Sequence, residues 1–258
     1  MYAHLSDHLS VTLRLYTFFL VSNPPSHQLN SGHGGFQEMD QLPVFETITK
    51  YQAHVNNPAR MAELTARAFD RAIIERGPTQ LNIPRDFFYG ENNFFIPAPK
   101  IIEQGAGGPA SLAAAADLIA GAKNPVLLCG GGVVIGDAIQ EARALAEFVS
   151  MPVAVTYLHN DAFPADHPLM CGPLGYQGHQ GAMNVIAEAD VVIALGTRLN
   201  PFGTNPQFGI DYWPKNAKLI QVEADFKRLN VTKNADVCVH GDAKKAAAEI
   251  LNLLKGNS

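Results

Sequence analysis

The chain has 258 residues, which suits one large or two ordinary domains and is enough to bury a sizeable core. Hydrophobic residues make up 47% and charged residues 17%, a balance typical of globular proteins rather than disordered or fibrous ones. The net charge of -5 supplies no basic footprint for a phosphate backbone, which argues against nucleic acid and leaves small molecules or other protein chains as partners.

The N-terminal segment contains one apolar run, LSVTLRLYTFFLVS (9–22). Arg14 interrupts it, and it is shorter than the roughly 20 apolar residues that cross a bilayer. It also lacks the basic start of a secretory signal. The isolated positions of Cys129, Cys171 and Cys238 favour reduced thiols over a disulfide framework or a zinc site. We therefore expect a cytoplasmic protein with no membrane partner.

The first predicted element is an amphipathic helix. Asn57 is a candidate N-cap, Pro58 suits the first turn, and Glu63 and Arg67 are spaced to pair on one face. The helix is expected to end near Gly77, and its apolar residues recur on one side: Met61, Leu64, Ala68 and Ala72.

A predicted strand, TQLNIP (79–84), follows this helix. The segment 97–110 is rich in Pro and Gly without periodicity, which is typical of a linker. The sequence before residue 111 therefore predicts only part of an α/β domain.

From Val126 onward, short apolar runs alternate with helical patterns, the signature of a parallel sheet with helices on both faces. The runs are apolar nearly throughout, as in strands buried on both faces. The predicted strands are 125–129, 152–157, 189–196 and 217–225, and the predicted helices are 111–122, 137–149, 180–188 and 242–255. The fold class is α/β: a doubly wound, Rossmann-like parallel sheet preceded by a partial α/β domain.

Gly130, Gly131 and Gly132 follow the strand 125–129, where a dinucleotide-binding turn would lie. The fingerprint G-x-G-x-x-G needs an acidic residue about 20 residues later. Here the spacing from Gly130 to Gly136 is one residue too long, and the strand 152–157 has no acid at its end. These features favour a tight packing turn over a nicotinamide dinucleotide site.

Two other polar groups follow strand ends. Glu223 and Asp225 are candidates to hold the ribose of an adenine nucleotide in a different crevice. His159, Asp161, Asp166 and His167 share one loop but lack the fixed spacing of a helical metal site, so we expect loop-shaping residues there and no metal. No G-x-S-x-G elbow or Ser-His-Asp arrangement is present.

Four longer segments carry a family resemblance: GGFQEMDQLPVFETITKYQAHV (34–55), GPTQLNIPRDFFYG (77–90), TYLHNDAFPADHPLMCGPLGYQGHQGAMNVI (156–186) and ADVVIALGTRLNPFGTNPQFGIDYWPKNAKLIQVEAD (189–225). They resemble the sulfoacetaldehyde acetyltransferase branch of the thiamine diphosphate enzymes, which also include acetolactate synthase. The resemblance covers residues 34 to about 255 and implies a transferase of taurine catabolism. It would convert sulfoacetaldehyde and phosphate into acetyl phosphate and sulfite on thiamine diphosphate held by magnesium.

The family has a pyrimidine-binding domain, a middle domain, and a domain for the diphosphate and metal. The resemblance implies that 32–96 is the C-terminal part of the first domain, 97–110 a linker and 111–258 the middle domain, while 1–31 is unmatched. The upstream glutamate and the magnesium-binding G-D-G to Asn segment have no counterpart. We therefore expect an enzyme fragment that is inactive by itself, and a homo-oligomer for the complete enzyme.

The resemblance also assigns site residues. Phe36 and Gln37 match a catalytic pair facing the cofactor's reactive end, where a neutral amide can hydrogen-bond an intermediate's oxygen without adding charge. Tyr176, Gln177 and Phe202 match loop positions at the active-site mouth or at the middle domain's nucleotide, FAD or ADP, which some members bind.

A sulfonate substrate needs cations or oriented donors. Arg198 is the first candidate because it follows the strand 189–196, at the edge where α/β sheets bind ligands, and His179 is the second. The alternative for Arg198 is a structural pairing with Asp190 or a loop carbonyl.

Four functions stay open at this point. TYLHNDAFP and GPLGYQG resemble the sulfoacetaldehyde branch more than the acetolactate or oxalyl-CoA branches, which favours the acetyltransferase fragment. The alternatives are a carboligase or decarboxylase fragment like acetolactate synthase, a non-catalytic middle domain that binds a nucleotide at Gly130–Gly132 or at Glu223 and Asp225, and an interaction protein that docks on full-length subunits.

Overall fold

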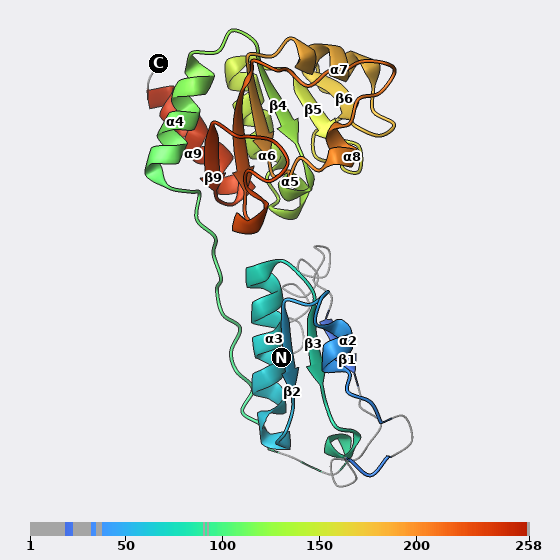
Figure 1. The fold of residues 1–258 in the computed structure, drawn as a ribbon. Coiled ribbons are helices and arrows are strands. Elements are labelled where there is room, and N and C mark those ends of the chain that lie inside the picture. The colour runs from blue at the N-terminus through green and yellow to red at the C-terminus, as the bar shows by residue number, and fades with distance from the viewer. Residues whose placement is uncertain (1–18, 23–31, 35–37, 90, 92, 257–258) are drawn as a thin grey trace. The chain divides into compact units, whose positions relative to one another are not determined.

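The computed structural model describes residues 19–22, 32–34, 38–89, 91 and 93–256. The chain divides into two compact units, Met1–Glu103 and Gln104–Ser258 (Figure 1). Both units contain a parallel sheet with helices packed on it, which confirms the α/β fold class.

The first unit contains a three-stranded parallel sheet in the order β1-β3-β2. Its strands are β1 (Phe19–Ser22), β2 (Tyr51–His54) and β3 (Thr79–Asn82), and its helices are α2 (Leu42–Phe45) and α3 (Met61–Glu75). Helix α3 packs on one face of this sheet, and the core between them includes Val55, Leu64, Leu81 and Ile83.

The predicted helix is confirmed, with a refinement at each end. The Asn57 side chain accepts a hydrogen bond from the Ala59 N–H at 3.0 Å, so it caps a 3-10 turn, Pro58–Arg60, that leads into α3. Arg67 pairs with Glu63 at 2.7 Å. The helix ends where Arg76 turns into the left-handed region, with φ 48°, one residue before the predicted Gly77.

The strand predicted at 79–84 forms as β3, and a ladder of amides accounts for its buried polar residues. Gln52 Nε2 donates to Gln80 Oε1 at 2.6 Å, and Gln80 Nε2 donates to Asn82 Oδ1 at 2.8 Å. These bonds satisfy polar groups that would otherwise be costly to bury. Strand β2, which carries Gln52, was not predicted because its four residues, YQAH, show neither a long apolar run nor clear alternation.

The second unit contains six parallel strands in the order β6-β5-β4-β7-β8-β9. Counted along this unit, the order is 3-2-1-4-5-6, the doubly wound order with its switch point between β4 and β7. The strands are β4 (Pro125–Cys129), β5 (Val153–Thr156), β6 (Met170–Leu174), β7 (Val191–Leu195), β8 (Lys218–Glu223) and β9 (Val237–His240).

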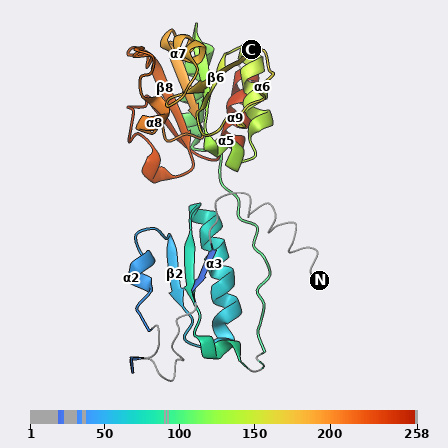
Figure 2. The same ribbon diagram turned by 90° about the vertical axis from the view of Figure 1, so that its right-hand side faces the viewer.

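Helices cover both faces of this sheet. Helices α6 and α9 lie side by side on one face, with α4 against α9, and α7 lies on the other face (Figure 2). The helices are α4 (Pro109–Ala120), α5 (Gly131–Ile135), α6 (Ile139–Val149), α7 (Gln180–Ala187), α8 (Pro201–Thr204) and α9 (Ala243–Gly256).

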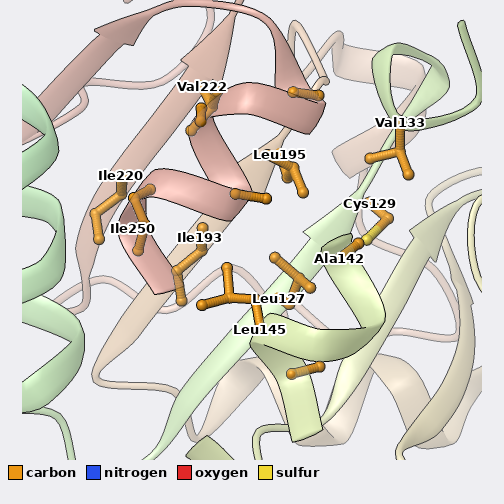
Figure 3. Close-up of a cluster of buried hydrophobic side chains, with 14 of the residues drawn as sticks. Leu127, Cys129, Val133, Ala142, Leu145, Ile193, Leu195, Ile220, Val222 and Ile250 are labelled. Atoms are coloured by element: carbon orange, nitrogen blue, oxygen red, sulfur yellow. The ribbon is translucent and has the colours of Figure 1, made fainter. Parts of the chain in front are cut away.

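Alternate strand residues separate into two cores. Leu127, Ile193 and Val222 point toward α6 and α9, where they meet Leu145 and Ile250 (Figure 3). Their neighbours along the strands, such as Leu128 and Ala194, pack with α7 in the second core. Strands with apolar residues on both faces therefore fit between two helical layers, as their composition predicted.

Several elements of the second unit differ from the predictions. Strands β6 and β9 were missed because both lie at the edges of the sheet, where exposure breaks the apolar run, and because β6 contains Gly172 and Pro173. The helix predicted at 137–149 forms as α6, and a further short helix, α5, which was not predicted, precedes it. Helix α5 starts directly at Gly131, and Asp137, in the left-handed region with φ 51°, separates it from α6.

We predict that Ile193→Ala destabilises the second unit by about 2–5 kcal/mol, because it leaves a cavity at the centre of the sheet. Ile193 is 0% exposed and pairs in register with Leu127 and Ile220. Urea unfolding followed by the fluorescence of Trp213, the single tryptophan, measures the change.

Ile101→Ala is the matched control, since that side chain is 93% exposed, and it should change stability by no more than about 0.5 kcal/mol. Equal effects of the two substitutions would contradict this assignment of the core.

Candidate functional site

The predicted site residues of the second unit gather at the carboxyl edge of its sheet. All six strands are parallel, so the loops after them leave from the same edge (Figure 1). Each predicted residue follows a strand end: Gly130, Gly131 and Gly132 after β4; Tyr176, Gln177 and His179 after β6; Arg198 and Phe202 after β7; Glu223, the last residue of β8, and Asp225. In open α/β sheets, ligands bind at this edge.

The glycine turn after β4 is packed against protein atoms. The Gly132 N–H donates to Gly196 O at 2.7 Å, and the Gly130 N–H donates to Leu195 O at 3.0 Å. A Cβ on Gly132 would lie 2.6 Å from Gly196 Cα, and one on Gly131 would lie 2.5 Å from His159 Nε2. The loop after β7 and the side chain of His159 come so close to these positions that they explain why glycine stands there.

Glu223 and Asp225 use their carboxylates locally. Glu223 is 9% exposed, and its Oε1 accepts from the Asp225 N–H at 3.1 Å. Asp225 caps the next 3-10 turn by accepting from the Lys227 N–H at 3.0 Å, and it pairs with Arg228 at 3.2 Å. These bonds shape the turn after β8 and give both acids a structural role.

Three aromatic side chains cluster where the loops after β5, β6 and β7 meet. The ring of Tyr176 lies 6.1 Å from that of Tyr157 and 5.4 Å from that of Phe202. Tyr176 and Phe202 are 44% and 57% exposed, and the Tyr176 N–H donates to Phe202 O at 2.9 Å. The sequence reasoning did not single out Tyr157, although its place at the end of a predicted strand was a usable signal.

The turn that carries Tyr176 and Gln177 is tightly held. Gly175 has φ 84°, and a Cβ there would lie 2.6 Å from Gly203. Gln177 is a non-glycine residue in the left-handed region, with φ 55°. Burial raises the pKa of the Tyr212 phenol to about 12, while the backbone N–H of Gly175 acts in the opposite direction.

Arg198 is exposed, and within the described part of the chain its guanidinium forms no ion pair. The expected alternative partner, Asp190, lies before β7, whereas Arg198 lies after it. Asp190 instead accepts hydrogen bonds from the N–H groups of Lys123 (2.7 Å) and Asn124 (2.9 Å). Burial acts to raise the pKa of Asp190, but these and neighbouring backbone N–H groups lower it overall. The predicted alternative, an ion pair between Arg198 and Asp190, is therefore wrong.

The histidines have different surroundings. His179 is exposed at the N-cap of α7, where its ring packs close to Gly172 and Gly181. His159 Nδ1 lies 3.8 Å from Asp161, and His167 pairs with Glu147 at 3.0 Å. The described residues contain no group of three or more His, Cys, Asp or Glu side chains that could hold a metal ion. Phe36 and Gln37 lie outside the described residues.

The strand order, the two helical layers and the loops at the carboxyl edge define the second unit as a doubly wound domain of the Rossmann type. Residues 112–250 match the family model described as "Thiamine pyrophosphate enzyme, central domain". The chain therefore belongs to the thiamine pyrophosphate enzyme family.

Several curated relatives match most of this chain. The sulfoacetaldehyde acetyltransferases of Castellaniella defragrans and Alcaligenes xylosoxydans xylosoxydans are 58% and 59% identical over 93% and 90% of it. A probable acetolactate synthase large subunit of Methanocaldococcus jannaschii is 36% identical over 86%. The chain spans only 38–40% of the length of these relatives.

The fold also matches a solved structure. A chain from Mycobacterium smegmatis, described as a thiamin diphosphate-dependent enzyme, superposes with a TM-score of 0.78 at 23% identity. The match covers 98% of this chain and 49% of that one, which shows a shared fold. Among the described residues, no helix has both the length and the hydropathy needed to cross a membrane.

We predict that Gly132→Ala destabilises the second unit by about 1–3 kcal/mol, because the new Cβ collides with the backbone of Gly196. This exceeds the gain of up to about 1 kcal/mol that alanine brings over glycine inside a helix. Urea unfolding followed by Trp213 fluorescence measures the destabilisation by Gly132→Ala.

Gly131→Ala is the matched comparison, since the three atoms nearest to its Cβ all belong to the His159 ring, which can rotate away. The destabilisation by Gly131→Ala should be smaller than that by Gly132→Ala, and it should vanish in a His159→Ala background. If Gly131→Ala destabilised the unit equally in the His159→Ala background, that result would contradict this packing.

Proposed function

We propose that this chain is part of a thiamine diphosphate-dependent acetyltransferase that converts sulfoacetaldehyde and phosphate into acetyl phosphate and sulfite. One observation carries the proposal: identity to the sulfoacetaldehyde acetyltransferases reaches 58–59%, against 36% for the M. jannaschii acetolactate synthase relative. This difference favours the acetyltransferase over an acetolactate synthase-like carboligase. Taurine catabolism and a homo-oligomer follow from the same resemblance, a cytoplasmic location follows from the N-terminal segment and the isolated cysteines, and all three stay predictions.

The proposed domain organisation has three parts in the matched region. Residues 32–96 would form the C-terminal part of the pyrimidine-binding domain, 97–110 the linker and 111–258 the middle domain. The division of the chain after Glu103 and the family match over 112–250 support this assignment.

In this proposal the second unit contributes substrate recognition. Arg198 would bind the sulfonate, because an exposed guanidinium without an ion pair in the described residues can offer two parallel N–H donors to an oxyanion. The aromatic cluster of Tyr157, Tyr176 and Phe202 lies at the same edge and would shield the site from water. Gln177 and His179 would add polar contacts from the loop after β6.

Thiamine diphosphate would supply the carbanion chemistry in the complete enzyme. The described residues hold no carboxylate cluster that fits its magnesium ion, so we assign the metal ion no ligand among them. Phe36 and Gln37 remain our proposed contacts to the cofactor's reactive end, by resemblance. The names of the relatives do not point to FAD or ADP, and the packed turn at Gly130–Gly132 favours neither.

The test replaces the homologous segment of the C. defragrans enzyme with residues 38–250 of this chain. We expect the chimera to release sulfite and form acetyl phosphate from sulfoacetaldehyde in a phosphate-dependent way, and to make no acetolactate from pyruvate. A folded chimera that makes acetolactate without releasing sulfite would replace the proposal with the carboligase.

The same chimera tests Arg198. We predict that Arg198→Ala raises KM for sulfoacetaldehyde by roughly tenfold or more, as expected for the loss of a charged hydrogen bond, while KM for phosphate stays unchanged. Arg143→Ala is the matched control, because Arg143 pairs with Glu147 on the surface of α6. An unchanged KM for sulfoacetaldehyde would remove Arg198 from the site.

A further inference from the structure

A buried glutamine in β8 connects two loops at the carboxyl edge of the second unit. Gln221 is 1% exposed. Its Nε2 donates to the carbonyl oxygens of Thr197 at 3.2 Å and Arg228 at 3.3 Å, and its Oε1 accepts from the Asn230 N–H at 2.8 Å. Both donors and the acceptor are used, so this amide is satisfied only while the two loops keep their present positions.

The first of these loops carries Arg198, and its backbone is fixed on both sides of that residue. Gln221 holds the carbonyl of Thr197, and Thr232 Oγ1 donates to the carbonyl of Arg198 at 3.3 Å. The Leu199 N–H in turn donates to Thr197 Oγ1 at 3.1 Å. Three consecutive residues are therefore held by hydrogen bonds, while the Arg198 side chain is left exposed.

The backbone at this point is strained. Leu199 has φ 54°, in the left-handed region that a bulky residue rarely adopts, and its side chain is 1% exposed in the second core. Such a conformation persists only where the surroundings fix it, and it is frequent at ligand sites. Burial of Leu199 and the bonds around it supply that fixation.

The second loop, which follows β8, does not neutralise the charge of Arg198. Arg228, whose carbonyl Gln221 also holds, pairs with Asp225 at 3.2 Å. The acid nearest along β8, Glu223, accepts from the Asp225 N–H. The two acids at the end of β8 thus have their own partners, and neither forms an ion pair with Arg198 in the described residues.

We propose that Gln221 is a positioning residue for anion binding: it holds the loop after β7 in the strained conformation that presents the Arg198 guanidinium to a sulfonate group. This inference rests on the proposed function, because it deepens the role given there to Arg198. Two-donor recognition of an oxyanion depends on the direction of the guanidinium, so a shift of the backbone that carries it weakens binding.

The experiment measures the dissociation constant of 2-hydroxyethanesulfonate for the full 258-residue chain by calorimetry or by NMR titration. The main variant is Gln221→Met, which keeps the size of the side chain and removes its three hydrogen bonds. We expect it to raise the dissociation constant by roughly threefold to tenfold, and Arg198→Ala to raise it by roughly tenfold or more.

The double variant separates positioning from a general loss of structure. In the Arg198→Ala background, Gln221→Met should have no further effect, because its influence passes through the guanidinium. An equal effect with and without Arg198 would overturn the proposal, and so would no effect of Gln221→Met where Arg198→Ala weakens binding. Unchanged binding in Arg198→Ala would instead overturn the proposed role of Arg198, and the inference with it.

A milder variant covers the case in which Gln221→Met does not fold. Thr232→Val removes only the hydroxyl that donates to Arg198 O, at a half-buried position. We expect roughly a twofold rise in the dissociation constant with an unchanged melting temperature. No change in sulfonate affinity for this variant would contradict the proposal that the Arg198 backbone is held for binding.

Discussion

The close approach of Gly132 and Gly196 fixes the carboxyl edge of the second unit. The Gly132 N–H donates to Gly196 O at 2.7 Å, and the two backbones meet with no side chain between them. This contact joins the ends of β4 and β7, the two central strands between which the strand order reverses. The loop after β7, which carries Arg198 and Phe202, leaves from this junction, so the glycines serve to bring strands and loops together.

Buried groups hold the loops after β6 and β7 in place. Gln221 fixes the loop after β7, and Gly175 packs directly on Gly203, which joins the turns after β6 and β7. Both loops contain a non-glycine residue in the left-handed region, Gln177 and Leu199. Strain of this kind needs a rigid frame, which the two cores on either side of the sheet provide.

In the proposed enzyme, the described residues of the second unit would serve substrate recognition. The second unit presents a cation and aromatic rings at the carboxyl edge, while its buried acids shape turns and its buried thiol, Cys129, is inert because burial raises the pKa. Recognition by the middle domain and cofactor chemistry elsewhere in the complete enzyme together form the proposed acetyltransferase.

The sequence by itself determined the α/β class, the central strands β4, β5, β7 and β8, and the long helices α3, α4, α6, α7 and α9, because these elements depend on local periodicity and on burial from both sides. It also placed Arg198 directly after a predicted strand, while the family resemblance placed Tyr176 and Phe202 in loops. Only the tertiary structure decided that β6 and β9 complete the sheet, that His159 lies over Gly131, and that Asp190 is committed to the backbone at the opposite edge from Arg198. Gln221 likewise resembles any polar residue in a strand until the fold brings its partners to it. These features depend on contacts between residues far apart in the chain, which local patterns do not encode.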